Sequence, residues 1–251
     1  TNSLTLSAPN PSNPVYAATS NWAYKVVISG NYAYVAGPNI GLAIIDISDP
    51  NNPGTPIYKF TTGYAYDLVI DGNYAYLANG TSGLAIIDIS NPSNPGSPVY
   101  RDTNGTAQNI AKDGNYVYMG IGASSGLAII DVSDPVNPGN PIYTLTKVSN
   151  INVNVTVNGI AFSPFKYGSS STNRNYGYVA FSSVLGQSKS GLMWFDITDP
   201  TNPGSNSAIS YQDFVGEALD VVINANYAYV GAEHGLVIFD LLKLGTTDFK
   251  F

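Results

Sequence analysis

The chain has 251 residues, of which only 11% are charged, and its 10 Lys+Arg against 17 Asp+Glu give a formal net charge of −7. This acidic balance argues against a nucleic-acid partner and an anionic membrane, because both bind basic surfaces. The absence of cysteine excludes disulfides and thiolate metal sites, and the single His234 excludes a multi-histidine metal site. No apolar run approaches the roughly 20 residues of a membrane-spanning helix. We therefore expect no metal, no cofactor and no membrane span.

Five copies of one repeat run along the chain, each with an Asn-Tyr-x-Tyr segment followed by a Gly-Leu segment that ends in Asp. In the second copy these are residues 73–78 (Asn-Tyr-Ala-Tyr-Leu-Ala) and 83–88 (Gly-Leu-Ala-Ile-Ile-Asp). The Gly-Leu glycines stand at positions 41, 83, 126, 191 and 235, so the steps between them are 42, 43, 65 and 44 residues. The longer third step indicates an insertion near Phe165–Arg174, between the first two strands of the fourth copy.

Each copy contains four short segments that are rich in Val, Ile and Tyr and separated by Gly, Asn, Asp and Pro, which is typical of strands and turns. In the second copy we place them at about 64–71, 73–79, 83–90 and 97–102. Four strands in a repeat of this length are typical of one β-propeller blade. We therefore predict an all-β fold, a five-bladed β-propeller of four-stranded antiparallel blades.

The fifth copy stops after Asp240 and Leu241 without a segment for its outer strand, whereas Ala8–Tyr16 resembles the outer-strand region Ser90–Tyr100 of the second copy. We therefore predict that the N-terminal segment supplies the outer strand of the last blade and closes the ring. The prediction is a single propeller domain over 1–251, with repeats at about 20–61, 62–102, 103–146, 147–213 and 214–241 plus 8–19, and terminal extensions at 1–7 and 242–251.

The Asn-Tyr-Ala-Tyr-Val-Ala and Gly-Leu-Ala-Ile-Ile-Asp-Ile-Ser-Asp-Pro segments resemble LVIVD repeats, which recur in bacterial and archaeal surface and secreted proteins. The resemblance covers residues 8–241, and the fourth copy departs most from it, with Met193–Phe195 and the insertion. It implies a β-propeller at a surface location and no shared reaction. The chain starts at Thr1, and we expect an extracellular or cell-surface protein from which an N-terminal leader has been removed.

A candidate ligand site lies where the inner strands begin. Alignment of the copies places five residues at equivalent positions, and these would form a polar ring at one mouth of the axial channel: Lys25, Asp67, Asn109, Gly159 and Asp220. We favour a hydrated, charge-balanced channel, and any small-ligand site would lie at this ring. A glycosidase that uses Asp67 and Asp220 as acid and base is a weaker alternative, and we assign no catalytic residue.

Three other residue patterns each allow a functional and a structural interpretation. Paired tyrosines such as Tyr74 and Tyr76 recur in every copy, and packing between blades is favoured over a role as sugar platforms. The repeated Asp that includes Asp46 precedes a turn; it is expected to accept hydrogen bonds from that turn, rather than to bind Ca²⁺ with Asp49 and Asn52. His234 is expected to be a polar hairpin residue and not part of a catalytic triad.

Candidate modification and assembly residues lie outside the ring. Asn79, Asn104 and Asn154 begin Asn-x-Ser/Thr sequons and are candidate glycosylation sites. The two terminal extensions contain β-prone stretches that could add strands to a neighbouring molecule, and the candidate assembly residues are Leu4, Leu6, Phe249 and Phe251.

The near-identical copies and the lack of catalytic motifs predict a non-enzymatic extracellular structural or adhesive β-propeller that self-assembles into an array or filament. Its expected partners are other copies of itself or surface polymers and glycans. The alternative is a lectin-like glycan-binding module, with sites between blades or at Phe165, Lys166 and Tyr167 in the insertion. A glycosidase is the least favoured hypothesis.

Overall fold

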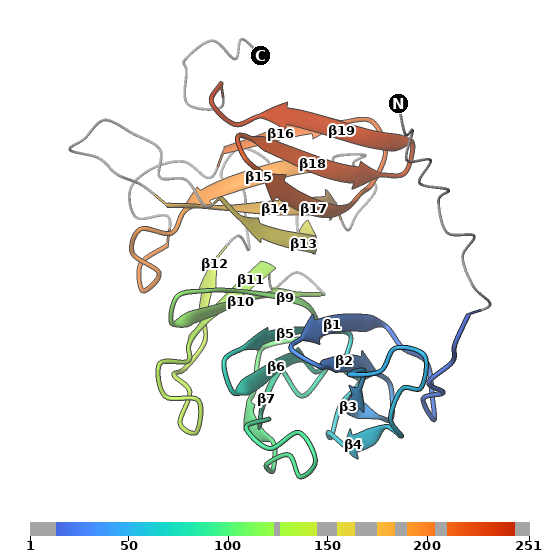
Figure 1. The fold of residues 1–251 in the computed structure, drawn as a ribbon. Coiled ribbons are helices and arrows are strands. Elements are labelled where there is room, and N and C mark those ends of the chain that lie inside the picture. Colours follow the sequence, from blue (N-terminus) through green and yellow to red (C-terminus); the bar gives the residue numbers. More distant parts are fainter. Residues whose placement is uncertain are drawn as a thin grey trace, which may run out of the picture.

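The computed structural model describes residues 14–122, 126–144, 155–163, 175–183, 190–203 and 210–243. Across these ranges the chain forms strands and turns and no helix, so none of the described part offers a helix that could cross a membrane. The strands make five antiparallel sheets that follow one another along the chain (Figure 1). The fold is all-β, and each sheet is one blade of a β-propeller.

The first three blades have four strands each. Blade 1 contains β1 (Lys25–Ser29), β2 (Tyr32–Gly37), β3 (Gly41–Asp46) and β4 (Ile57–Lys59). Blade 2 contains β5 (Asp67–Asp71), β6 (Tyr74–Ala78), β7 (Leu84–Asp88) and β8 (Val99–Arg101). Blade 3 contains β9 (Ala107–Asp113), β10 (Tyr116–Ile121), β11 (Gly126–Asp131) and β12 (Ile142–Thr144).

The last two blades continue this order. Blade 4 contains β13 (Val155–Phe162), β14 (Tyr176–Ser183), β15 (Ser190–Asp196) and β16 (Ser210–Phe214). Blade 5 contains β17 (Ala218–Asn224), β18 (Tyr227–Ala232) and β19 (Gly235–Asp240), which form a three-stranded sheet. Figure 1 shows the first strand of each blade nearest the middle of the molecule.

The predicted outer strand of blade 5 falls mostly on residues 1–13, which lie outside the described residues. Val15 and Tyr16, which end the predicted strand, are exposed and belong to none of the described sheets. Closure of the ring by the N-terminal segment therefore stays a prediction.

The hydrophobic core lies between blades rather than within one sheet. In the first joint, Tyr34, Leu42 and Ile44 of blade 1 pack against Leu68 and Leu77 of blade 2. The same pattern recurs at the next joints, because each copy of the repeat places apolar residues on both faces of its strands. Every internal blade is thereby covered by a neighbour on either side.

The second tyrosine of each pair belongs to these joints. Tyr34, Tyr76, Tyr118 and Tyr178 are all buried among the residues of neighbouring blades. Burial on the inter-blade faces confirms the packing interpretation for these four side chains and removes them as sugar platforms.

The repeated Asp at the end of the third strand caps the turn that follows it. The Asp88 carboxylate accepts the Ser90 N–H at 2.8 Å, and Asp46, Asp131 and Asp196 make the same contact in their own blades. Hydrogen bonds from Ser48 and Ser90 lower the pKa of Asp46 and Asp88. The turn-capping interpretation is confirmed, and the described residues contain no group of three or more His, Cys, Asp or Glu placed to hold a metal ion.

Burial of Tyr76 makes the stability of the fold depend on alkaline pH. Burial, with smaller contributions from Asp71 and Tyr74, raises the pKa of Tyr76 from its usual 10.0 to about 12. The neutral phenol is favoured in the folded state, so its stabilising contribution is complete below pH 10 and is lost as the pH rises from 10 to 12. We expect the melting temperature to fall in this window.

Circular dichroism melts across this alkaline range test the expectation. Tyr76→Phe should reduce the alkaline loss, while Tyr16→Phe, at an exposed position, should leave it unchanged. A Tyr76→Phe protein that loses stability with pH as steeply as the wild type would contradict the assignment to Tyr76.

Candidate functional site

The strand register supports the alignment that defines the polar ring. Each ring residue pairs with the same position of the second strand in its own blade: Lys25 with Ala36, Asp67 with Ala78, Asn109 with Gly120, Gly159 with Ala180 and Asp220 with Gly231. Because blades 1 to 5 share this register, the five residues occupy one level at the start of the inner strands.

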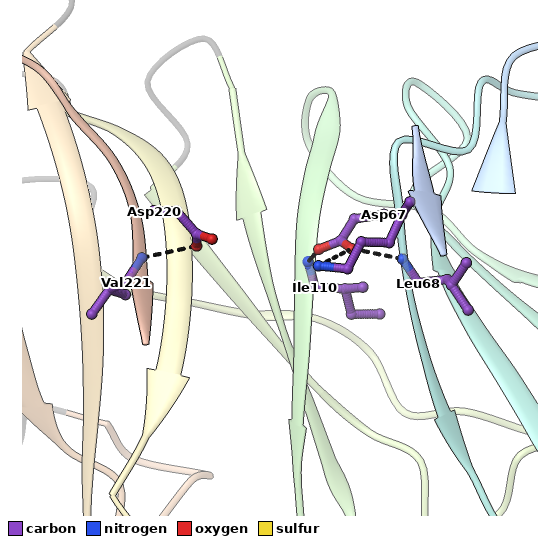
Figure 2. Close-up of polar contacts among 6 residues, drawn as sticks. Asp67, Leu68, Ile110, Asp220 and Val221 are labelled. Carbon is purple, nitrogen blue, oxygen red and sulfur yellow. Dashed lines mark hydrogen bonds and ion pairs between the residues drawn. The ribbon is translucent and has the colours of Figure 1, made fainter. Parts of the chain in front are cut away.

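These residues line one cavity at the mouth of the axial channel. Its volume is about 400 Å³, and inner strands of all five blades contribute to its wall. Asp67 and Asp220 stand on strands that face each other across this space (Figure 2). The volume lies within the roughly 300–1,000 Å³ typical of small-molecule sites.

Asp67 joins three neighbouring blades at this level. Its carboxylate accepts the Leu68 N–H at 2.9 Å in its own strand and the Ile110 N–H at 3.0 Å from blade 3. The Lys25 ammonium nitrogen of blade 1 lies 3.3 Å from the same carboxylate. With both oxygens engaged by backbone amides and one also by an ammonium group, the Asp67 carboxylate is held in place as a structural anchor.

Asn109 makes the next link around the ring. Its side-chain nitrogen donates to the Val157 carbonyl of blade 4 at 2.7 Å. Its Oδ1 is buried and has no hydrogen-bond partner among the described residues. A Cβ on Gly120 would overlap that oxygen, so this glycine makes room for the Asn109 amide.

Asp220 and Gly159 close the described part of the ring. A Cβ on Gly159 would lie 2.5 Å from Asp220 Oδ1 and 2.9 Å from its Cα, so blade 5 can approach blade 4 only where a side chain is missing. The Asp220 carboxylate accepts the Val221 N–H at 2.8 Å, and the residue is exposed toward the channel (Figure 2). Unlike Asp67, Asp220 has no following blade within the described residues to which it could bond.

A second layer, which the sequence analysis missed, lies one residue before the ring in each blade: Tyr24, Tyr66, Gln108, Asn158 and Leu219. In blades 3, 4 and 5 this residue is the bulged one, where the strand register shifts. The Asn158 amide donates to Ala218 O at 2.6 Å and Ser182 Oγ at 2.9 Å. The same alignment shifted by one position would have found this layer.

The aromatic members of the second layer form a stack. The Tyr24 and Tyr66 rings lie 5.5 Å apart at an angle of 4°, and Trp22 meets Tyr24 edge-on at 6.5 Å. Tyr66 lines the cavity, and Trp22 is 72% exposed and Tyr24 43% exposed. An exposed aromatic surface therefore continues outward from the cavity over blades 1 and 2.

The other candidate residues are distributed over the rest of the chain. Asn79 is buried and its amide lies against Thr61 and Gly63, so a glycan on its nitrogen has no space in this fold. Asn104 is exposed, and His234 is exposed in the hairpin between β18 and β19. The remaining candidates lie outside the described residues: Asn154, Leu4, Leu6, Phe249, Phe251, Phe165, Lys166 and Tyr167.

Five sheets around an axial cavity define a β-propeller built from repeated blades. The chain belongs to the LVIVD repeat family, whose model matches residues 22–57, 62–98, 104–141 and 215–241. The match omits the fourth copy, which is the one that departs most from the repeat. No curated protein gives a significant match to the sequence.

Solved structures support the fold at low sequence identity. The computationally designed Ika8 protein is 13% identical with a TM-score of 0.57, over 87% of this chain and 58% of that one. The periplasmic gluconolactonase PpgL of Pseudomonas aeruginosa is 12% identical with a TM-score of 0.56, over 84% and 63%. An ancestral GH74 enzyme is 16% identical with a TM-score of 0.54, over 88% and 31%. The chain thus spans less than two thirds of each of these three.

Proposed function

We propose that this protein is a non-enzymatic structural module that associates head-to-tail with copies of itself through its two terminal blades. One observation carries the proposal: among the described residues, nothing covers the face of blade 5 that every other blade buries. Leu236 and Ile238 are 63% and 54% exposed, while their equivalents Leu42 and Ile44 in blade 1 are 0% and 1% exposed. Exposed apolar side chains in one patch are typical of an interaction surface.

Blade 1 carries the complementary face. Val26 is 57% exposed, while its equivalent Leu68 in blade 2 is 2% exposed because it packs against blade 1. Ile28 lies beside Val26 on the same face and is also exposed, whereas the outer part of the face is covered near Ala17. At each internal joint, the face of one blade that corresponds to the exposed face of blade 5 packs against the face of the next blade that corresponds to the exposed face of blade 1.

The four internal joints leave unpacked the outward face of blade 5 and the inner-strand part of the blade 1 face, so the occupant we propose for blade 5 is the β1 strand of a second copy's blade 1. Polar contacts also favour packing of blade 5 against blade 1 of a second copy. At the joint of blades 2 and 3, Asp67 accepts the Ile110 N–H of the following blade. In the proposed joint, Asp220 takes the place of Asp67 and faces the Val26 N–H and the Lys25 ammonium group of the second copy.

A heterologous contact of this kind adds one copy after another and generates a filament or a larger ring. The low fraction of charged residues, 11%, suits dense lateral contacts and supports the further proposal of a role at the cell surface, with adhesion to surface polymers. The engagement of Asp67 by Lys25 and two backbone amides supports a structural rather than a catalytic role for that carboxylate.

Two single substitutions, each blocking one face, test the proposal. We expect the mass of the wild-type protein to rise with concentration in sedimentation or light scattering, and electron microscopy to show chains of copies. Ile238→Asp and Val26→Asp should each be monomeric, because a charge would be buried in the joint. Val136→Asp, at an exposed turn residue of blade 3, is the matched control and should assemble normally.

A mixture of the two variants gives the sharper result. Each keeps one intact face, so an equimolar mixture of Ile238→Asp and Val26→Asp should form a heterodimer and nothing larger. A wild-type protein that stays monomeric at every concentration would overturn the proposal. So would variants that assemble as the wild type does.

A further inference from the structure

We infer that the channel mouth is a binding site for a neutral sugar residue. The site shares Asp220 with the proposed assembly joint, so the inference concerns the unassembled molecule, in which Asp220 lines the cavity. The cavity is lined by one aromatic residue, Tyr66 of blade 2, which stacks on Tyr24 of blade 1, and by polar groups on blades 3, 4 and 5. A sugar would need both the aromatic and the polar residues to bind.

The aromatic side chains beside the cavity are exposed and are not needed for packing between blades. Tyr34, Tyr76, Tyr118 and Tyr178 are buried in joints, whereas Tyr24 and Trp22 are exposed and form a stacked and edge-on series with Tyr66. Tyr66 sits at the inner end of this series and lines the cavity. Flat aromatic surfaces offer a large apolar contact with a polar rim, and the C–H face of a pyranose ring is an apolar surface of matching shape.

The polar wall offers both donors and acceptors. The Asp220 carboxylate is fixed by the Val221 N–H and exposed toward the cavity, and the Gln108 and Asn158 amides border the same space. Asn109 Oδ1 is buried without a hydrogen-bond partner among the described residues, and Asn109 also borders the cavity. Sugar hydroxyls both donate and accept, so they can satisfy such a mixed set.

The charges at the site select against anionic ligands. Asp67 is already paired with Lys25 and held by two backbone amides, so it leaves little attraction for a cation. Asp220 carries a charge that would repel the carboxylate of an acidic sugar, and a carboxylate accepts hydrogen bonds well from neutral hydroxyls. A neutral hexose or N-acetylhexosamine unit, alone or at the end of a chain, is therefore the ligand class that fits.

Titration calorimetry with glucose, galactose, mannose, N-acetylglucosamine and their disaccharides tests the inference. We expect saturable binding of at least one of these sugars, and weaker binding of glucuronic acid than of its neutral counterpart. Tyr66→Ala should weaken the affinity by about tenfold through loss of the stacking surface, and Asp220→Ala should weaken it similarly. Tyr66→Phe keeps the ring and should retain most of the affinity.

Phe60→Ala is the matched control. Phe60 stacks on Tyr58 with ring centres 6.0 Å apart and is exposed, yet it does not border the cavity, so its loss should leave sugar affinity unchanged. Melting temperatures confirm that each variant is folded. Absence of saturable binding to every sugar in the panel overturns the inference, and so does binding that Tyr66→Ala and Asp220→Ala leave unchanged. The titrations are made on Ile238→Asp, the variant blocked in assembly, so that no second copy engages Asp220, and Tyr66→Ala and Asp220→Ala are added to that variant.

Discussion

Leu42→Ala is expected to destabilise the protein by about 2–5 kcal/mol, whereas Leu236→Ala is expected to cost less than about 1 kcal/mol. The two leucines occupy the same position of the repeat, on the third strand of blades 1 and 5. Leu42 is fully buried in the joint between blades 1 and 2, so its truncation leaves a cavity. Leu236 lies on the uncovered face of blade 5, where water or a partner fills the space. Denaturant unfolding of both variants at low protein concentration measures the difference.

Comparing Leu42→Ala with Leu236→Ala distinguishes three arrangements of the terminal blades: a ring closed within one chain, an open ring, and blade 5 packed against a second copy. If the ring closes within one chain, Leu236 becomes as buried as Leu42 and the two substitutions cost the same at any concentration. If blade 5 meets a second copy, the cost of Leu236→Ala should grow with protein concentration, because association adds to the stability of the folded state. Leu84→Ala, at the equivalent buried position of blade 2, is the internal standard and should behave like Leu42→Ala.

The repeat made most of the fold predictable. Segments placed at about 73–79 and 83–90 contain β6 and β7, and the five ring residues share one register position because each copy keeps the same spacing. What the sequence could not show was the exposure of blade 5. Leu236 stands in the same Gly-Leu motif as Leu42, and its burial depends on whether another blade follows, which is a property of the neighbour and not of the local sequence.

The candidate site was predicted in part. Alignment found the charged level of the channel mouth, with Lys25, Asp67 and Asp220. The layer before it was missed, because Tyr24 and Tyr66 precede regular strands while Leu219 is a bulged residue, and a bulge breaks the alternation on which pattern analysis depends. Glycan binding was expected between blades or at the insertion, whereas the sugar site we propose lies on the axis, where the sequence analysis placed any small-ligand site.

The second large effect is expected at the glycine that begins the third strand. Gly83 has a φ of +70°, and a Cβ there would overlap the Arg101 carbonyl and lie 2.8 Å from the Thr103 nitrogen, because the chain leaving the outer strand β8 passes directly over it. An alanine there would cost about 1–3 kcal/mol in backbone strain, because its φ is positive. Overpacking against the chain above it would cost about 1–3 kcal/mol more. We expect Gly83→Ala to lower the free energy of unfolding by about 2–5 kcal/mol in denaturant titrations.

Gly235 is the matched position in blade 5 and tests the closure of the ring. Its φ of +131° also disfavours a side chain, but a Cβ there would meet nothing within 4 Å, since the described residues supply no outer strand to blade 5. Gly235→Ala should therefore cost only the backbone strain, about 1–3 kcal/mol. A cost equal to that of Gly83→Ala would mean that a strand passes over Gly235 in solution, as expected if the N-terminal segment completes the blade. Deleting that segment should then remove the extra cost, whereas an unchanged cost would assign the covering strand to another copy.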